Sequence, residues 1–343
     1  KLTIAFFIFA VLISLAATKH RGPFKSPWFW GAGLLVLAFL TPYAIWNAMN
    51  GWPTVDFYIH HGGLNGSGPI GFLALQLLIM NPVNLPLVIA GLVFYLRRPA
   101  GSQFKLLGVA YIVLLIVFAL TNAKPYFIGP MYPFLFAGGS LLFTAATSRR
   151  WVWWLTRRVF PVVLVGFTIF FAPLLMPVLP PATYASTYGS LSVLGNSAAA
   201  QNTAGVFPQY LGDRFGWDTM VTTVSQIYHN LPSQEQSQAC IFASNYGEAG
   251  ALIFLGKQNG LPPVISGHNN FYIWGPGPCV GKSLFITVGA SLSDLQFLFG
   301  NVTQVGLITC SYCMGSENDL PVYLASQLKG TLQDIWPQVK SFS

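Results

Sequence analysis

The sequence has little charge. Asp, Glu, Lys and Arg make up only 8% of its 343 residues, whereas 53% are hydrophobic. This composition excludes an ordinary soluble protein. Acidic residues are scarcest: the first 180 residues hold 12 Lys and Arg but a single acid, Asp56, and residues 181–343 hold 5 Lys and Arg with 8 acids. The basic excess is confined to the first half, so it does not indicate a nucleic-acid-binding surface.

Several motifs of well-known protein classes are also missing. The chain has no Gly-rich phosphate loop, no nucleophile with a base at diagnostic spacing and no cluster of metal-ligand residues. No acid or base falls in the middle of an apolar run, which argues against an ion-coupled transporter. The chain starts at Lys1 and enters an apolar run without a signal-peptide pattern, so we interpret it as the remainder of a longer protein.

What is present is a series of apolar runs that predicts a polytopic helical membrane bundle over residues 1–180. We expect about six spans, the third of them broken at Asn81-Pro82. Gly138-Gly139 is expected to allow close contact between helices. The predicted spans are Leu2–Ala17, Trp28–Ala48, Pro69–Leu96, Leu106–Leu120, Phe127–Thr147 and Val159–Leu179.

Basic residues between the runs predict their orientation. They form three clusters in alternate loops, which the positive-inside rule places on the cytoplasmic side. Everything that follows the last span then lies outside the cytoplasm. The clusters are Lys19/Arg21/Lys25, Arg97/Arg98/Lys105 and Arg149/Arg150/Arg157/Arg158.

The last half predicts a linker over residues 181–216 and a small extracytoplasmic α/β domain over residues 217–343. Strands alternate with helices, which favours a partly parallel sheet. The predicted strands are Ala239–Ala243, Pro263–Ser266, Ser283–Gly289 and Gln304–Thr309, and the predicted helices are Asp218–Asn230, Glu248–Lys257, Ser293–Phe299 and Val322–Val339.

All four cysteines lie in this domain. An extracytoplasmic location permits disulfides, and we favour Cys240–Cys279 with a tight Cys310–Cys313 bridge; reduced core cysteines are an equal alternative. The spacing Cys310-Ser-Tyr-Cys313 also occurs in metal and redox pairs, but no second Cys/His pair accompanies it.

Lys124 is the first candidate site residue. It lies between two spans on the outer side, where basic residues are otherwise rare, so we expect it to pair with an anion such as a lipid-linked phosphate. Tyr126 and Tyr132 follow it in the same polar segment and are further candidates for binding the donor phosphate. Asp56, His60 and His61 occupy another outer loop and supply an acid and two imidazoles for acceptor binding or proton transfer. Alternatively, the histidines are solvated and Asp56 caps a helix.

A second candidate site follows the first strand of the α/β domain. The turn Ala243-Ser-Asn-Tyr-Gly-Glu-Ala-Gly250 leads from a strand into a helix, where ligands often bind in α/β sheets. Asn245 and Glu248 are its candidate residues, and His268 in the loop after the next strand is the third. Glu248 could equally be held by the helix N-terminus and have no further role.

Four segments together resemble the GT-C superfamily of bacterial glycosyltransferases. They are Asn50-Gly-Trp-Pro-Thr54, the span broken at Asn81-Pro82, Lys124-Pro-Tyr-Phe-Ile-Gly-Pro-Met-Tyr-Pro133, and Asn245-Tyr-Gly-Glu-Ala-Gly250 with Ser266-Gly-His-Asn269. The nearest group is glycosyltransferase family 39, the dolichyl-phosphate-mannose protein mannosyltransferase-like proteins, related to the lipid A aminoarabinose transferase. The chain resembles their C-terminal two-thirds.

The resemblance implies a multi-pass enzyme of the bacterial inner membrane with its C-terminal domain in the periplasm. It would transfer a sugar, with inversion, from a polyprenyl-phosphate donor to a glycan, lipid or protein acceptor. The family's Lys-Pro-Tyr-like motif lies by the donor phosphate, which assigns that role to Lys124. The family's catalytic aspartate lies in a first outer loop that this chain lacks, so we expect the chain to be inactive alone. We assign no cofactor: Asp56 could position the acceptor or a divalent cation, but one carboxylate is too few to define a metal site. The alternative is a non-catalytic, membrane-anchored protein that binds a glycan or lipid or acts as a scaffold.

Overall fold

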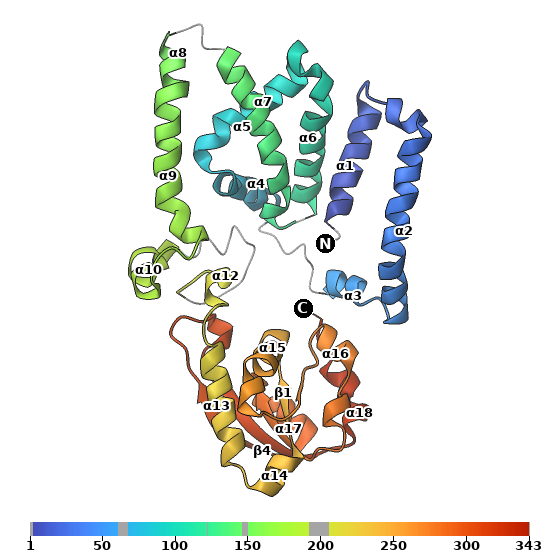
Figure 1. The fold of residues 1–343 in the computed structure, drawn as a ribbon, viewed down its shortest axis with the longest axis vertical. Coiled ribbons are helices and arrows are strands. Elements are labelled where there is room, and N and C mark those ends of the chain that lie inside the picture. Colours follow the sequence, from blue (N-terminus) through green and yellow to red (C-terminus); the bar gives the residue numbers. More distant parts are fainter. Residues whose placement is uncertain (1–2, 61–67, 122, 146–149, 192–205, 343) are drawn as a thin grey trace. The chain divides into compact units, whose positions relative to one another are not determined.

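The computed structural model describes residues 3–60, 68–121, 123–145, 150–191 and 206–342, apart from the side chains of Tyr58 and His60. It divides into two compact units, which we treat separately (Figure 1). The first holds the described residues of Lys1–Ala48 and Gly62–Pro180. The second holds those of Met49–His61, Pro181–Ser192 and Asn202–Ser343.

The first unit is helical. Its α- and π-helical elements are α1 (Ile4–Ala17), α2 (Pro27–Met49), α4 (Gly68–Ile79), α5 (Leu85–Arg97), α6 (Lys105–Leu120), α7 (Tyr132–Ala145), α8 (Arg150–Trp154), the π-helical turn η5 (Leu155–Val159) and α9 (Phe160–Leu175). Short 3₁₀ segments join them: η1 (Gly22–Lys25), η2 (Pro82–Asn84), η3 (Pro99–Phe104) and η4 (Pro125–Met131).

Four helical segments in the described residues are long and apolar enough to cross a membrane: Pro27–Met49, Pro99–Leu120, Pro125–Ala145 and Arg150–Leu175. The pair α4 and η2–α5 is bent by 93° and makes a fifth if it counts as one span. The first predicted span, α1, is apolar but has 14 residues, fewer than the roughly 20 that cross a bilayer unassisted.

The predicted break at Asn81-Pro82 has a local cause. Asn81 has a φ of 60°, outside the helical region, and its side-chain oxygen accepts a hydrogen bond from the backbone nitrogen of Val83 at 3.1 Å. Pro82 cannot donate the hydrogen bond that would continue α4. The chain therefore turns sharply here and restarts as η2 and α5.

Glycines bring α5 and α7 together, as predicted for Gly138-Gly139. A Cβ atom at Gly139 would collide with the backbone carbonyl of Leu87, and one at Gly91 would collide with that of Leu135. Gly138 lies against the ring of Tyr95. Small residues let the two backbones approach this closely, which increases the van der Waals contact between the helices.

The second unit contains α3 (Pro53–His60), α10 (Pro181–Tyr188) and a compact α/β fold (Figure 1). The strands are β1 (Ala239–Ala243), β2 (Val264–Ile265), β3 (Leu284–Val288), β4 (Phe299–Ile308) and β5 (Leu320–Leu328). The remaining α-helices are α12 (Gln209–Gly212), α13 (Trp217–Asn230), α14 (Ser233–Gln238), α15 (Tyr246–Phe254), α16 (Asn270–Trp274), α17 (Leu292–Leu298) and α18 (Leu332–Ile335). The 3₁₀ segments are η6 (Gly189–Leu191), η7 (Gly256–Asn259), η8 (Gly277–Cys279), η9 (Gly315–Glu317) and η10 (Trp336–Val339).

The sheet is mixed, with strand order β2-β1-β3-β5-β4. β1 runs parallel to β2 and β3, whereas β5 is antiparallel to β3 and β4. Each face has its own core. Ile241 and Ile286 pack on one face with residues of α13 and α15, while Cys240 and Phe285 pack on the other with residues of α17, α18 and η10. Alternate residues of each strand thus serve the two cores.

The helix predicted over Val322–Val339 is wrong for its first part, which is strand β5; only α18 and η10 beyond it are helical. Val322 and Leu324 join the core of one face, whereas Tyr323 and Ala325 join the core of the other. Because both faces are buried, the strand has no polar alternation, and its apolar run resembles that of a buried helix.

Candidate functional site

Lys124 immediately precedes η4, between α6 and α7. Its side chain is half-buried, and its ammonium group has no hydrogen bond or ion pair within the described residues. Tyr126, two residues on, is exposed and packs its ring edge-on against Phe127, with ring centroids 5.0 Å apart. The lysine therefore remains available to an anion from outside the described residues.

The backbone beside Lys124 is held by a buried glutamine. The side-chain nitrogen of Gln76 in α4 donates to the carbonyl oxygen of Pro125 at 3.1 Å and to that of Phe72 at 3.1 Å. Its oxygen accepts a hydrogen bond from the hydroxyl of Tyr132 at 2.7 Å. Gln76 thereby ties the lysine-bearing segment to two helices within an apolar core.

The structure gives Tyr132 a different role from the one predicted and adds Gln76, which the sequence analysis did not single out. We expected Tyr132 beside a donor phosphate, but its side chain is buried and its hydroxyl donates to Gln76. The structure thus gives it a positioning contact. Gln76 was missed, and the one signal for it was a lone amide in the apolar stretch from Gly71 to Met80.

Asp56 belongs to the second unit, whereas Lys124 belongs to the first. The Asp56 carboxylate oxygen lies 2.6 Å from the ammonium nitrogen of Lys340, which is near the C-terminal end of the same unit. Lys340 also lies 4.6 Å from the ring centroid of Phe342. The acid predicted to line an acceptor site is therefore part of an ion pair. His60 ends α3 with its side chain outside the described residues, and His61 lies wholly outside them.

The turn after β1 forms the second candidate site, which brings together Asn245, Glu248 and His268 as predicted. Asn245 begins α15 with a capping box: its side-chain oxygen accepts from the backbone nitrogen of Glu248 at 2.9 Å, and the Glu248 carboxylate accepts from the backbone nitrogen of Asn245 at 3.2 Å. This reciprocal arrangement satisfies donors that a helix start leaves unpaired.

Glu248 is 1% exposed. Its carboxylate also accepts hydrogen bonds from the backbone nitrogen of Ser244 at 2.8 Å and the side-chain nitrogen of Asn245 at 2.9 Å. Burial, followed by the nearby Glu317 carboxylate, raises the pKa of Glu248 to about 8, although the backbone hydrogen bonds oppose that shift. Glu248 is therefore mostly protonated at neutral pH.

Glu317, at the end of η9, is a site residue that sequence reasoning missed. One of its carboxylate oxygens accepts from the side-chain nitrogen of Asn245 at 3.0 Å, while the other is buried without a hydrogen-bond partner in the described part of the chain. Burial raises its pKa, the hydrogen bond from Asn245 lowers it, and Asp213 raises it further. No local pattern pointed to Glu317, because a loop 72 positions away from Asn245 supplies it.

His268 contacts the turn at Tyr246. Its Nδ1 atom accepts a hydrogen bond from the backbone nitrogen of Tyr246 at 3.2 Å, and the two rings lie 5.0 Å apart between centroids. An accepting Nδ1 leaves the proton of the neutral ring on Nε2. The imidazole is buried, so its contacts order the turn.

The cysteines differ in state. Cys240 and Cys279 form the predicted disulfide, which links β1 to η8. The predicted Cys310–Cys313 bridge is wrong, because both of these cysteines are free thiols. The backbone nitrogen of Cys313 lies 3.1 Å from the sulfur of Cys310. Burial, followed by the neighbouring Cys310, raises the pKa of Cys313 to about 12, so its reactive thiolate is scarce at neutral pH. Within the described residues, no group of three His, Cys, Asp or Glu side chains is placed to hold a metal ion.

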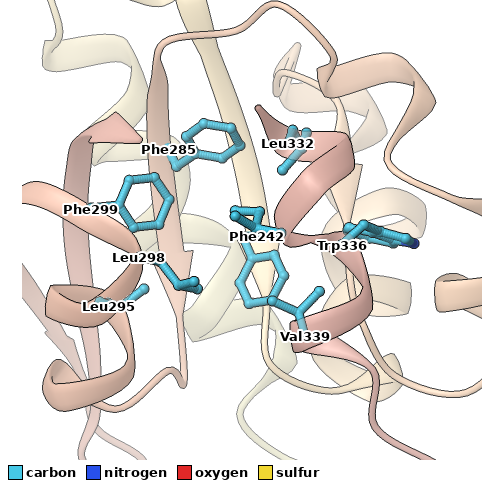
Figure 2. Close-up of a pocket in the computed structure, with 9 residues that line it drawn as sticks. Phe242, Phe285, Leu295, Leu298, Phe299, Leu332, Trp336 and Val339 are labelled. Atoms are coloured by element: carbon cyan, nitrogen blue, oxygen red, sulfur yellow. The ribbon is translucent and has the colours of Figure 1, made fainter. Parts of the chain in front are cut away.

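An apolar cavity lies on the face of the sheet that packs against α17, α18 and η10 (Figure 2). It has a volume of about 20 Å³, and every lining side chain is apolar, including Phe242, Phe285 and Trp336. A space of this size admits about one water molecule, yet it offers no polar side chain to hold one. We therefore assign it to core packing.

Comparison with known proteins adds no relative: no protein-family model, curated protein or solved structure matches the chain.

Proposed function

We propose that the protein is a multi-pass glycosyltransferase of the bacterial inner membrane. It takes a sugar from a polyprenyl-phosphate-linked donor and transfers it to a glycan, lipid or protein acceptor on the periplasmic face. The observation that carries this proposal is Lys124: a half-buried lysine between two apolar segments, without a partner in the described residues and on a backbone that Gln76 fixes. The resemblance of its segment to the family 39 motif supports the same role.

The proposed chemistry follows from the negative charge that develops on the lipid phosphate as its bond to the sugar breaks. The acceptor hydroxyl gives up its proton to a base and attacks the anomeric carbon, the bond from that carbon to the lipid phosphate breaks, and the configuration inverts. Negative charge then accumulates on the departing phosphate. A fixed ammonium group at that position stabilises the transition state more than the ground state, which lowers the barrier. Lysine suits this task because it binds phosphate as a point charge.

A second candidate function is binding without transfer, as a scaffold or a lipid- or glycan-binding protein. One observation favours it: the first unit, Lys1–Ala48 and Gly62–Pro180, contains no Asp or Glu. The unit therefore offers Lys124 as an anion partner but no carboxylate to take the proton from an acceptor hydroxyl.

Two measurements on the protein expressed from its gene and reconstituted in nanodiscs separate these functions. The first is the affinity for polyprenyl phosphate. Lys124→Ala should weaken it by about 1.5–3 kcal/mol, the typical contribution of a charge-assisted hydrogen bond. Lys105→Ala, a basic residue that begins the preceding α6, is the control and should leave the affinity unchanged.

The second measurement is release of polyprenyl phosphate from a panel of polyprenyl-phosphate sugars, followed by mass spectrometry. Release that requires an added acceptor and is lost in Lys124→Ala supports the transferase. Binding of the lipid without release from any donor supports the scaffold. Equal lipid affinity in Lys124→Ala and the wild type would show that Lys124 does not bind the lipid phosphate. The proposal would then lose the observation on which it rests.

A further inference from the structure

An open groove of about 630 Å³ lies on the sheet of the second unit, away from the turn after β1. Its floor comes from β3, β4 and β5, and α14 forms a wall. The volume falls in the range of roughly 300–1,000 Å³ that is typical of small-molecule sites. We propose that this groove binds a neutral oligosaccharide.

The floor of the groove is the solvent-exposed end of a sheet face that is buried at its other end. Leu284 of β3 pairs with Ser326 of β5, which also pairs with Asn301 of β4, and Leu324 pairs with Thr303 in the next row. Side chains two apart on a strand share a face, so these rows extend the face whose other end packs against α13 and α15. Beyond those helices the same face is uncovered and presents both apolar and polar side chains.

Apart from Glu235, the polar side chains that line the groove are uncharged. Amide and hydroxyl groups of Asn301, Thr303 and Ser326 on the floor, and of Gln234 and Gln238 on the wall, make no side-chain hydrogen bond within the described residues. Asn318 of the same unit, in contrast, accepts a hydrogen bond from the backbone nitrogen of Cys310. Groups that both donate and accept match sugar hydroxyls, which do the same.

Charge and shape narrow the ligand class. Glu235 is the one charged side chain among the lining residues, and no Lys or Arg lines the groove, so an anionic ligand such as a phosphate is disfavoured. Leu284, Leu324 and Val305 offer apolar patches beside the polar groups, suited to the carbon-bearing face of a sugar ring. A peptide would instead pair with the exposed edge of β4 through its backbone.

The wall is held in place before any ligand arrives. The ammonium group of Lys282 donates to the carbonyl oxygen of Ser237 at 2.7 Å, and the side chain of Gln236 donates to the carbonyl oxygen of Leu231 at 2.8 Å. Both contacts fix α14 at the border of the groove. A prearranged site loses less conformational entropy on binding.

The test uses the reconstituted protein and four neutral trisaccharides: maltotriose, cellotriose, mannotriose and chitotriose, with glucose 6-phosphate as an anionic comparison. Calorimetry should give saturable millimolar or tighter binding of at least one trisaccharide. Asn301→Leu combined with Thr303→Val should weaken it about tenfold, since two polar contacts are lost while strand-compatible side chains remain. Gln304→Leu, on the same strand but outside the groove lining, is the matched control.

Ser326→Ala provides a second variant in case the double variant unfolds, which thermal melting would reveal. It should weaken binding severalfold. The inference is overturned if no trisaccharide binds, if binding is unchanged in the groove variants, or if glucose 6-phosphate binds more tightly. It stands apart from the proposed transferase activity, because lipid affinity at Lys124 and glycan affinity at this groove are measured separately.

Discussion

Glu248 and Glu317 accept hydrogen bonds from the same amide nitrogen, that of the Asn245 side chain, at 2.9 and 3.0 Å. One carboxyl group begins a helix after β1 and the other ends η9, so a single asparagine joins two distant parts of the second unit. Since both groups are buried, ionising both at once is costly. The stability of this unit should therefore depend on pH.

The sign of that dependence follows from Glu248. Its pKa is about 8 in the folded protein, above the ordinary value of 4.5 for a glutamate, so between these pH values the folded state holds a proton that the unfolded state releases. The contribution of the protonated Glu248 to the free energy of unfolding is fully present below about pH 4.5 and is lost as the pH rises through about 8. We expect the melting temperature of the wild type to fall across this range. Glu248→Gln should flatten that fall in differential scanning fluorimetry, whereas Glu235→Gln, at an exposed position, should retain it.

Gly289 should not tolerate a side chain. Its φ is +71°, and a Cβ atom would collide with the Glu248 carboxylate. Gly289→Ala should cost about 2–4 kcal/mol, combining backbone strain with overpacking. Gly260→Ala is the matched control: its φ is +62°, but the space around it is open, so only about 1 kcal/mol of strain is expected. Equal melting temperatures for the two variants would contradict the contact with Glu248.

Gln76 should be essential for the order of the Lys124 segment. Gln76→Leu leaves the Tyr132 hydroxyl and the Pro125 carbonyl buried without their partner, a loss of about 1–3 kcal/mol for each group. Adding Tyr132→Phe removes the unpaired hydroxyl and should restore part of the melting temperature. Hydrogen exchange over residues 123–131 should quicken in Gln76→Leu. Strictly additive effects of the two substitutions would argue against the hydrogen bond.

The Asp56–Lys340 pair should contribute little. Both side chains are partly exposed, at 25% and 38%, so water and salt screen the attraction. Asp56→Asn should cost less than about 1 kcal/mol at low salt, and the difference should shrink further at high salt. A large loss of glycosyl transfer in Asp56→Asn, with the melting temperature unchanged, would instead give Asp56 the acceptor-binding role that the sequence suggested.

The sequence predicted the local elements that depend on neighbouring residues. Asn81-Pro82 breaks a helix by its own chemistry, Gly138-Gly139 permits a close approach, and the segment with Asn245 and Glu248 turns from a strand into a helix. It failed at β5, where burial on both faces erased the alternation that identifies a strand.

Local sequence signals therefore suffice to predict the division into an apolar helical part and a mixed α/β part, together with the turn that carries Asn245 and Glu248. The distant groups that complete each site become visible only in the folded protein: Gln76 behind Lys124, Glu317 beside Glu248, and Lys340 against Asp56. The physical reason is that hydropathy, caps and breaks act over a few residues. Partners separated by tens to hundreds of positions meet only because packing brings their segments together.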